Sequence, residues 1–377
     1  MLTRVLKIML ALAAGAFLMG RAAAQSDQSH ASSVTFDEMI GQMLIVGFDG
    51  TRPQQKWPRK LGALLAKGHI GGVIFLKRNL SNAPNARALT RFFSQSASRH
   101  PAFIAVDQEG GSVQRLAGNV GLKRINSAQR VAAKLGPEQA YDYYRNVARQ
   151  LSQFGFNVNF GPVLDLNTNP QNPIIGRIGR SYSRDPEIVA RYGAAFVRAH
   201  QAEGVITALK HFPGHGSSRK DSHLGFVDIS ETWQEQELVP FARLIADGLA
   251  DMVMIGHLHL GRYQSRGDER LPATLSRVLL GDVLRGQLKF DGVVVSDDME
   301  MGAIRKRYAP GEALVRAIRA GNDLLILSGT TAGQTASPEH YIAAIKQAAL
   351  EDPALKTQIT QSYLRIVALK RRYLVRD

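Results

Sequence analysis

The chain has 377 residues, of which 45% are hydrophobic and 21% are charged, and its formal net charge is +15. This balance excludes a disordered tail and a many-span membrane protein, because enough apolar residues are present to form a large core under a polar surface. The absence of cysteine excludes a disulfide framework, a thiol nucleophile and an iron–sulfur site. The length alone is compatible with two domains or with one α/β barrel.

The first 24 residues have the pattern of a secretory signal peptide. Arg4 and Lys7 precede an apolar run over residues 8–19, and three alanines at 22–24 precede Gln25. The run is short of the roughly 20 apolar residues that span a bilayer, and no later stretch approaches that length. We therefore expect export to the periplasm or the outside after cleavage, with no transmembrane segment in the mature chain.

Removal of this signal would take away Arg4, Lys7 and Arg21 and no acidic residue, which lowers the formal charge from +15 to +12. The remaining basic residues are scattered over predicted helices and form no block with interleaved aromatic residues, so we expect no nucleic-acid partner. The surplus charge either serves solubility or suits anionic surroundings such as cell-wall polymers and lipid surfaces.

Eight short apolar runs bounded by turn residues follow one another along the chain. They are mostly continuous in apolar residues, which is typical of parallel strands that are covered on both faces. The predicted strands occupy residues 43–48, 72–76, 103–106, 157–160, 205–209, 252–255, 293–295 and 324–327.

Helix-like stretches with apolar residues at three- and four-residue spacing lie between these strands, for example at 140–154, 187–202, 235–246 and 312–320. The alternation predicts an α/β fold, a (β/α)8 TIM-type barrel, whose reactive groups lie on the loops that follow the strands. An open doubly wound sheet would need a glycine-rich phosphate turn after the first strand, and GFDGTRPQQ is a poor match. No linker or repeat divides the mature chain, so we expect a single catalytic domain over residues 25–377.

Polar residues accumulate where the predicted strands end. The carboxyl ends of barrel strands meet at one rim, so these side chains are expected to surround an active site. They are Asp107, Asp165, Lys210, His211, His257, Asp297 and Asp298.

Five of the ten histidines lie between His211 and His259, and the densest stretch is KHFPGHGSSRKDSH at 210–223. It predicts a loop longer than the usual connection of about two to six residues, and long loops at this face of a barrel often carry function. Asp221 precedes His223 by two residues, so its carboxylate can hold one ring nitrogen and raise the basicity of the other. The pair is a candidate proton shuttle, and a solvated surface pair is the alternative.

The stretch FDGVVVSDDMEM places Asp297 and Asp298 directly after a β-branched run. Adjacent residues on a strand point to opposite faces, so only one of the two carboxylates can face a ligand on the barrel axis. The two-residue periodicity of a strand does not indicate which of them does. A carboxylate and a proton shuttle are what glycoside hydrolysis needs. The second group is usually also a carboxylic acid, so a histidine held by an aspartate would be an atypical variant.

Five segments, in order along most of the mature chain, make this hypothesis specific. They are AVDQEGGSVQRL (105–116), GRSYSRDP (179–186), KHFPGHGSSRKDSH (210–223), PATLS (272–276) and GVVVSDDMEMGAI (292–304). Together they resemble the β-N-acetylhexosaminidases of glycoside hydrolase family 3. The loop ending in Asp-Ser-His separates this branch from the β-glucosidases of the family, which take their acid from a second domain.

The resemblance implies a retaining exo-β-N-acetylhexosaminidase that removes terminal N-acetylglucosamine through a covalent glycosyl-enzyme intermediate. It implies that Asp297 is the nucleophile and that His223 is the acid/base, assisted by Asp221. It implies no metal or other cofactor. The expected partner is a small carbohydrate, a cell-wall-derived or chitin-like N-acetylglucosaminide, and the expected enzyme is a monomer.

The same resemblance implies a set of residues that grip the sugar in the −1 subsite, with Asp107 accepting hydrogen bonds from two sugar hydroxyls. A buried carboxylate suits a diol, while arginine and lysine donate to hydroxyl and carbonyl oxygens. The implied substrate-binding residues are Asp107, Arg115, Arg180, Lys210 and His211.

The chain departs from the family pattern at two positions. Ser112 stands where relatives commonly have arginine, which removes one positive charge but leaves Arg115 at its expected offset from Asp107. IIGRIGRSYS holds two arginines, and the Arg-Ser-aromatic step favours Arg180 over Arg177.

The remaining polar residues of the rim have less specific interpretations. His257 and His259, two residues apart, would face the same side of a strand end and could chelate zinc, with a packing role as the alternative for His259. Asp165 is expected to support neighbouring loops as a hydrogen-bond acceptor, and His215 to order its loop.

Other functions remain open from the sequence alone. A family member of other sugar specificity, similar to the β-glucosidases, would keep the barrel and change the pocket. Substrate-assisted catalysis by the N-acetyl group and a metal-dependent amidohydrolase are two enzymatic rivals. A non-catalytic carbohydrate-binding barrel is the alternative outside the enzymes, although both the expected nucleophile and the expected proton shuttle are present.

Overall fold

The computed structural model describes residues 34–118, 120–264, 269–329 and 337–375. The predicted signal peptide, residues 1–24, lies outside the described residues. Among the helices of the described ranges, none is both long and apolar enough to cross a membrane.

Eight parallel strands close into a barrel in the order β1-β10-β9-β7-β5-β4-β3-β2. All eight strands predicted from the apolar runs are present, and almost all of their residues are buried. This closure confirms the (β/α)8 barrel and excludes the open doubly wound sheet. The barrel strands are β1 (Leu44–Val46), β2 (Gly72–Phe75), β3 (Phe103–Val106), β4 (Val158–Asn159), β5 (Ile206–Phe212), β7 (Met252–Ile255), β9 (Val293–Asp298) and β10 (Leu324–Leu327).

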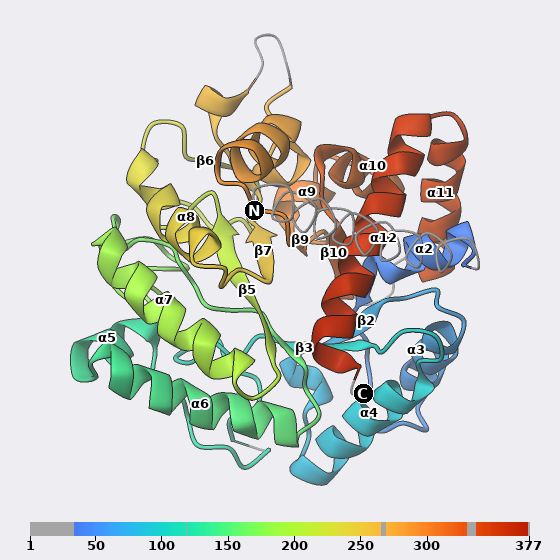
Figure 1. Ribbon diagram of the computed structural model, residues 1–377, viewed down its shortest axis with the longest axis horizontal. Coiled ribbons are helices and arrows are strands. Elements are labelled where there is room, and N and C mark those ends of the chain that lie inside the picture. Colours follow the sequence, from blue (N-terminus) through green and yellow to red (C-terminus); the bar gives the residue numbers. More distant parts are fainter. Residues whose placement is uncertain (1–33, 119, 265–268, 330–336, 376–377) are drawn as a thin grey trace, which may run out of the picture.

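The strands gather in the centre of the molecule and the helices surround them (Figure 1). The four predicted helices are found as α6, α7, α8 and α10, although the predicted stretch 235–246 is divided into a short 3₁₀ helix, Glu235–Leu238, and α8. The described helices are α2 (Phe36–Gln42), α3 (Lys56–Ala66), α4 (Ala83–Ser96), α5 (Ala128–Lys134), α6 (Pro137–Gln153), α7 (Pro186–Gln201), α8 (Val239–Ala246), α9 (Gly302–Arg305), α10 (Pro310–Ala320), α11 (Pro338–Leu350) and α12 (Pro353–Leu374).

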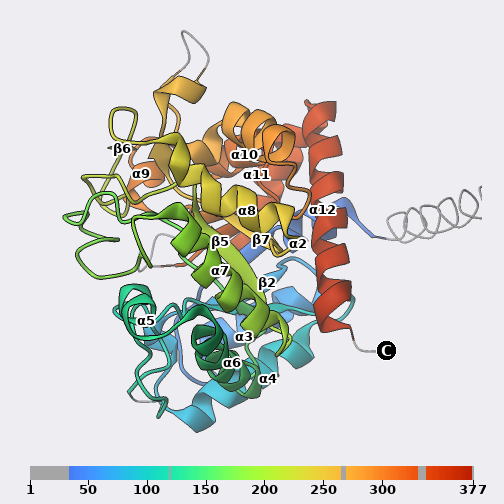
Figure 2. The ribbon, with the colours of Figure 1, turned by 60° about the vertical axis from the view of Figure 1, so that its left-hand side comes forward.

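Two Asp-Pro steps in the sequence begin helices. The Asp185 carboxylate accepts hydrogen bonds from the backbone N–H groups of Glu187 and Ile188 at the start of α7, and Asp352 does the same at the start of α12. Proline follows at the first helical position, where no backbone N–H is needed. In Figure 2, α12 runs along one side of the barrel.

The strand register shifts at two places near the rim. Between β5 and β7 the shift lies between Leu209 and Phe212, and between β10 and β9 it lies opposite residues 295–298. Each shift inserts one extra residue into the strand that carries candidate site residues, and such a bulge redirects side chains. A second, two-stranded sheet of β6 (Val227–Asp228) and β8 (Leu258–His259) follows the histidine loop.

Candidate active site

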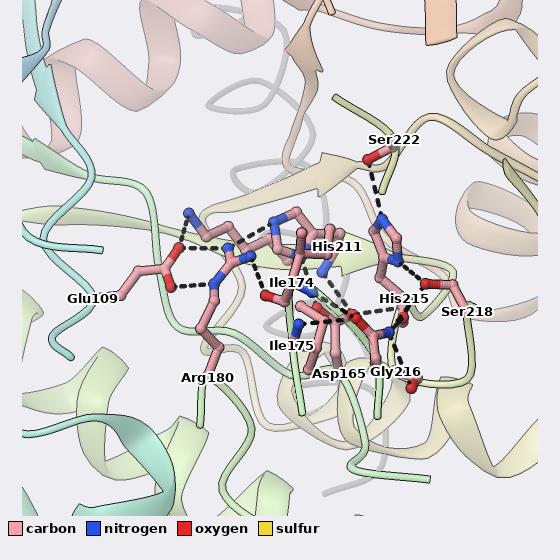
Figure 3. A network of polar contacts seen from close by, with 12 residues as sticks. Glu109, Asp165, Ile174, Ile175, Arg180, His211, His215, Gly216, Ser218 and Ser222 are labelled. Atoms are coloured by element: carbon pink, nitrogen blue, oxygen red, sulfur yellow. Dashed lines mark hydrogen bonds and ion pairs between the residues drawn. The ribbon is translucent and has the colours of Figure 1, made fainter. Parts of the chain in front are cut away.

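Two acidic and two basic side chains form a chain of ion pairs at the barrel rim. Lys210, on β5, donates from Nζ to Asp107 Oδ1 at 3.0 Å and lies 2.6 Å from Glu109 Oε1. Arg180 grips the Glu109 carboxylate with two hydrogen bonds of 2.8 Å (Figure 3). Glu109, Arg180 and Lys210 are all buried. Glu109 was not among the residues predicted from the sequence, although its position two residues after Asp107 would place it on the same side of an extended segment.

These ion pairs stabilise the charged forms of Glu109, Arg180 and Lys210. Burial has the largest influence on Glu109 and would raise the pKa of its carboxyl, but Arg180 and Lys210 outweigh it and lower that pKa well below its ordinary value. Burial likewise would lower the pKa of Arg180, and Glu109 more than reverses this. The rim therefore keeps two cations available beside the predicted sugar pocket, each balanced by a carboxylate.

Gln108 folds the segment that carries Arg115. Its side-chain oxygen accepts hydrogen bonds from the backbone N–H groups of Arg115 and Leu116, at 2.7 and 3.2 Å. The backbone of Gln108 is itself held by the buried Asn159 on β4. As a result, Arg115 reaches back to Asp107, with 3.5 Å between Nη2 and Oδ2. The predicted offset between these two residues is thus intact, even though Ser112 is an exposed turn residue.

Asp165 organises the first part of the histidine loop. It is fully buried, and its carboxylate accepts the backbone N–H groups of His211 and His215 and the Nδ1–H of His211, the last at 2.7 Å. Arginine has no acceptor, so the 3.3 Å contact between Arg180 Nη2 and His211 Nε2 makes Nε2 the acceptor and Nδ1 the donor to Asp165. Asp165 is therefore the loop-supporting acceptor that the sequence predicted.

His215 holds the middle of the loop. Its two ring nitrogens lie 2.8 Å from Ser218 Oγ and 3.1 Å from Ser222 Oγ (Figure 3). Burial lowers the pKa of His215 to about 4, so the ring is neutral and can donate to one serine and accept from the other. The loop-ordering role expected for His215 agrees with these contacts.

The Asp221–His223 pair lies at the outer end of the same loop. Asp221 Oδ1 accepts both the backbone N–H of His223 at 2.8 Å and its ring Nδ1–H at 2.7 Å. The His223 side chain is 59% exposed, so its Nε2 can reach solvent or a ligand. The predicted pairing of these residues is confirmed, while the acid/base role stays a prediction.

Asp297 and Asp298 have different surroundings. The Asp298 carboxylate is occupied by hydrogen bonds from its neighbours. It accepts from the Ser328 hydroxyl at 2.5 Å and from the backbone N–H groups of Ser328 and Glu300. Asp297 accepts only the backbone N–H of Asp298 among the described residues. The structure thus distinguishes the two carboxylates, which the strand period alone did not.

The two pKa values diverge accordingly. Burial is the largest influence on Asp297 and would raise its pKa, but His257, His211 and His223 together lower it to about 2. Burial raises the pKa of Asp298 to about 6, despite the hydrogen bonds from Ser328. Asp297 therefore stays ionised down to a lower pH than Asp298, and His223 is near enough to act on it electrostatically.

His257 and His259 do not present a pair of open ring nitrogens. His257 uses one nitrogen with the Thr274 hydroxyl at 2.7 Å and the other with the carbonyl of Asp298 at 2.9 Å, and His259 Nδ1 lies 2.9 Å from the carbonyl of Leu271. These contacts favour structural roles over zinc binding. Arg177 is exposed and Arg180 is buried in the ion-pair chain, which agrees with the choice of Arg180.

A closed parallel barrel with an ionised carboxylate and an Asp-His pair at its carboxyl-terminal rim carries the two groups that the glycoside hydrolase hypothesis requires. The model of the glycosyl hydrolase family 3 N-terminal domain matches residues 35–369. The chain belongs to this family, which confirms the resemblance seen in the motifs.

The relatives found for the chain include proteins named as hexosaminidases. It is 31% identical over 369 residues to "Beta-hexosaminidase A" of Pseudoalteromonas piscicida, a match that covers 89% of this chain and 61% of the relative. It is 33% identical to an "Uncharacterized secreted glycosyl hydrolase" of Arthroderma benhamiae, with 88% and 92% covered. The structure of a family 3 beta-N-acetylglucosaminidase from Paenibacillus sp. FPU-7 superposes with a TM-score of 0.81 at 35% identity, with 90% and 63% covered. The chain thus spans less than two thirds of the first and third of these proteins.

Replacing Glu109 with Gln should impair both folding and turnover, because Lys210 and Arg180 would then face a neutral amide in a buried site. We expect the free energy of unfolding to fall by about 3 kcal/mol. The value of kcat/KM for an aryl glycoside that the wild-type enzyme hydrolyses should fall roughly 100-fold. This is the loss typical of substrate-positioning groups that are displaced by about an ångström. Urea unfolding and steady-state kinetics measure the two effects.

Glu203→Gln is the matched control for this substitution. Glu203 likewise bridges two cations, Arg145 and Arg149, but it does so at the surface. A surface ion pair contributes less than about 1 kcal/mol to the free energy of unfolding. Wild-type stability and kinetics in E109Q would contradict the role assigned to Glu109.

Proposed function

We propose that the chain is a retaining exo-β-N-acetylhexosaminidase that hydrolyses terminal N-acetylglucosamine through a covalent intermediate on Asp297. The observation that carries this proposal is the difference between Asp297 and Asp298: Ser328 occupies the Asp298 carboxylate, whereas the ionised Asp297 carboxylate accepts only a backbone N–H among the described residues. The Paenibacillus relative, named a beta-N-acetylglucosaminidase, supports this sugar, and the Pseudoalteromonas relative, named a beta-hexosaminidase, supports the wider class of hexosaminides.

In the first step Asp297 attacks C1 of the sugar. A carboxylate oxygen forms a bond to C1 while the bond from C1 to the leaving oxygen breaks, and His223 gives that oxygen the proton from Nε2. Asp221 accepts the hydrogen bond from the Nδ1–H of His223 throughout and stabilises the imidazole ring while the ring is charged. The low pKa of Asp297 supports this step, because an ionised carboxylate is a much stronger nucleophile than a carboxylic acid.

In the second step His223 is neutral and removes a proton from water at Nε2. The water oxygen bonds to C1, the bond from C1 to Asp297 breaks, and the sugar leaves with its configuration unchanged. The exposure of His223 supports this reversal of roles, since the same nitrogen must meet first the leaving oxygen and then water.

The ion-pair chain would bind the sugar in the −1 subsite. Asp107 faces the rim with a partly exposed carboxylate and would accept from two sugar hydroxyls. Lys210, Arg180, Arg115 and His211 would donate to or orient the hydroxyl and carbonyl oxygens around it. Their fixed geometry supports positioning of the sugar without the cost of ordering long side chains at the moment of binding.

The proposed substrate is a cell-wall-derived or chitin-like N-acetylglucosaminide, and the enzyme acts as a monomer without a metal or other cofactor. We further propose export after removal of residues 1–24. The signal-like sequence and the relative named as secreted support export.

A panel of aryl glycosides tests the proposed sugar. We expect release from 4-nitrophenyl N-acetyl-β-glucosaminide with a kcat/KM at least about 100-fold above that for the β-glucoside, because a site built around an N-acetyl group leaves its polar donors unpaired with glucose. Preference for the glucoside would indicate a different sugar specificity, and binding without turnover of any member would indicate a non-catalytic barrel.

Replacing His223 with Ala tests the proposed acid/base. The variant should lose roughly 100- to 10,000-fold in rate on N,N′-diacetylchitobiose, whose leaving group needs a proton. It should lose far less in the first step with a 2,4-dinitrophenyl glycoside, whose leaving group departs without one. Pre-steady-state release of dinitrophenol separates this step from hydrolysis of the intermediate. Equal losses on both substrates would contradict the assignment.

A further inference from the structure

The loop that carries the Asp221–His223 pair is docked by its backbone onto the turn that follows β9, residues 299–306, which includes the one-turn helix α9. Three successive carbonyls of the loop face this turn. That of Ser222 accepts from the N–H of Ala303 at 3.3 Å and that of His223 from the N–H of Gly302 at 3.1 Å. The carbonyl of Leu224 accepts from Lys306 Nζ at 2.7 Å.

Close approach at this contact requires glycine. A Cβ on Gly302 would lie 2.7 Å from the carbonyl oxygen of His223 and 2.9 Å from the carbonyl carbon and oxygen of Leu224. Distances under 3 Å to backbone atoms cannot be relieved by a side-chain rotation, so a larger residue would push the loop away. The backbone of Gly302 has no left-handed conformation, and glycine is needed here for space alone.

This contact fixes the position of the His223 ring relative to Asp297. In the part of the chain that the structure describes, the ring hydrogen-bonds only with Asp221, which belongs to the same loop. The ring therefore moves with the loop. The turn, by contrast, continues directly from β9, and the N–H of Met301 bonds to the carbonyl of Asp298 at 3.0 Å. One short segment, residues 297–306, thus carries the proposed nucleophile and the docking point of the proposed acid/base.

We propose that residues 301–306 form a latch that holds the acid/base loop over the sugar site, with Gly302 and Lys306 as positioning residues. The effect of the latch on catalysis rests on the proposed function of His223. The contact itself does not depend on that function. Docking of Ser222, His223 and Leu224 keeps Nε2 within reach of the leaving oxygen. Release of the latch would let the Asp221–His223 pair swing away as a unit, with its internal hydrogen bond intact.

Two substitutions weaken the latch from different sides. Gly302→Ala adds the Cβ that meets the loop backbone, and Lys306→Met removes the hydrogen bond to Leu224 while keeping most of the length of the side chain. Gly281→Ala is the control for the first, since its Cβ would have only an ordinary contact of 3.9 Å with Arg277. Arg305→Met is the control for the second, because it removes the same charge from the neighbouring exposed residue.

Hydrogen–deuterium exchange measures the latch without any substrate. In K306M the amides of residues 302 and 303 should exchange up to about tenfold faster, the effect of losing one charge-assisted hydrogen bond, and in G302A residue 303 and the loop should exchange faster still. The two control variants should match the wild type. Wild-type exchange in both G302A and K306M would overturn the latch, and K306M decides alone if G302A does not fold.

Kinetics on two leaving groups then measure what the latch does. We expect G302A to lose roughly 100-fold in kcat/KM on N,N′-diacetylchitobiose but to keep near wild-type release of 2,4-dinitrophenol in the first step. K306M should show the same pattern more weakly, and Lys306→Arg, which can still donate, should restore the rate. Equal losses on both substrates, or no loss despite faster exchange, would overturn the positioning role. A wild-type enzyme that hydrolyses neither substrate would instead refute the proposed function, while the exchange data would still decide whether the latch exists.

Discussion

The site depends on the pairing of charges that the barrel removes from water. Lys210 and Arg180 are buried cations, and a buried charge without a partner costs several kcal/mol. Glu109 bridges both of them, and Asp107 takes a second contact from Lys210. The proposed sugar-binding residues are therefore held by one another before any ligand arrives.

The two adjacent aspartates have separate tasks for a related reason. Two neighbouring carboxylates at one strand end would repel each other if both were ionised in the same pocket. Hydrogen bonds from Ser328 and from the Glu300 N–H occupy the Asp298 carboxylate, while the neighbouring histidines lower the pKa of Asp297 to about 2. The strand that carries Asp297 continues into the turn that docks the His223 loop, so the proposed nucleophile and the proposed proton shuttle share one support.

The sequence predicted the barrel because buried parallel strands are continuous in apolar residues, a signal that survives without tertiary information. It also predicted the rim, since the polar residues directly after those strands converge once the barrel closes. Glu109 was missed because its importance comes from two partners that lie far away in the sequence. The choice between Asp297 and Asp298 required the neighbouring Ser328, and the requirement for glycine at 302 required the approach of a loop from another part of the chain. The helix at 235–246 was divided because Pro240 lacks the N–H that a continuous helix would use.

The central claim is that Asp297 forms a bond to the sugar, and trapping of that bond tests it most directly. The enzyme would be incubated with a 5-fluoro N-acetylglucosaminyl fluoride, digested with trypsin and analysed by tandem mass spectrometry of the peptide 290–305. The account predicts a glycosyl adduct on Asp297 that is absent in Asp297→Asn. An adduct on Asp298, or steady turnover of the fluoride with no adduct and strong inhibition by a thiazoline mimic of the cyclised N-acetyl group, would contradict it and indicate substrate-assisted catalysis.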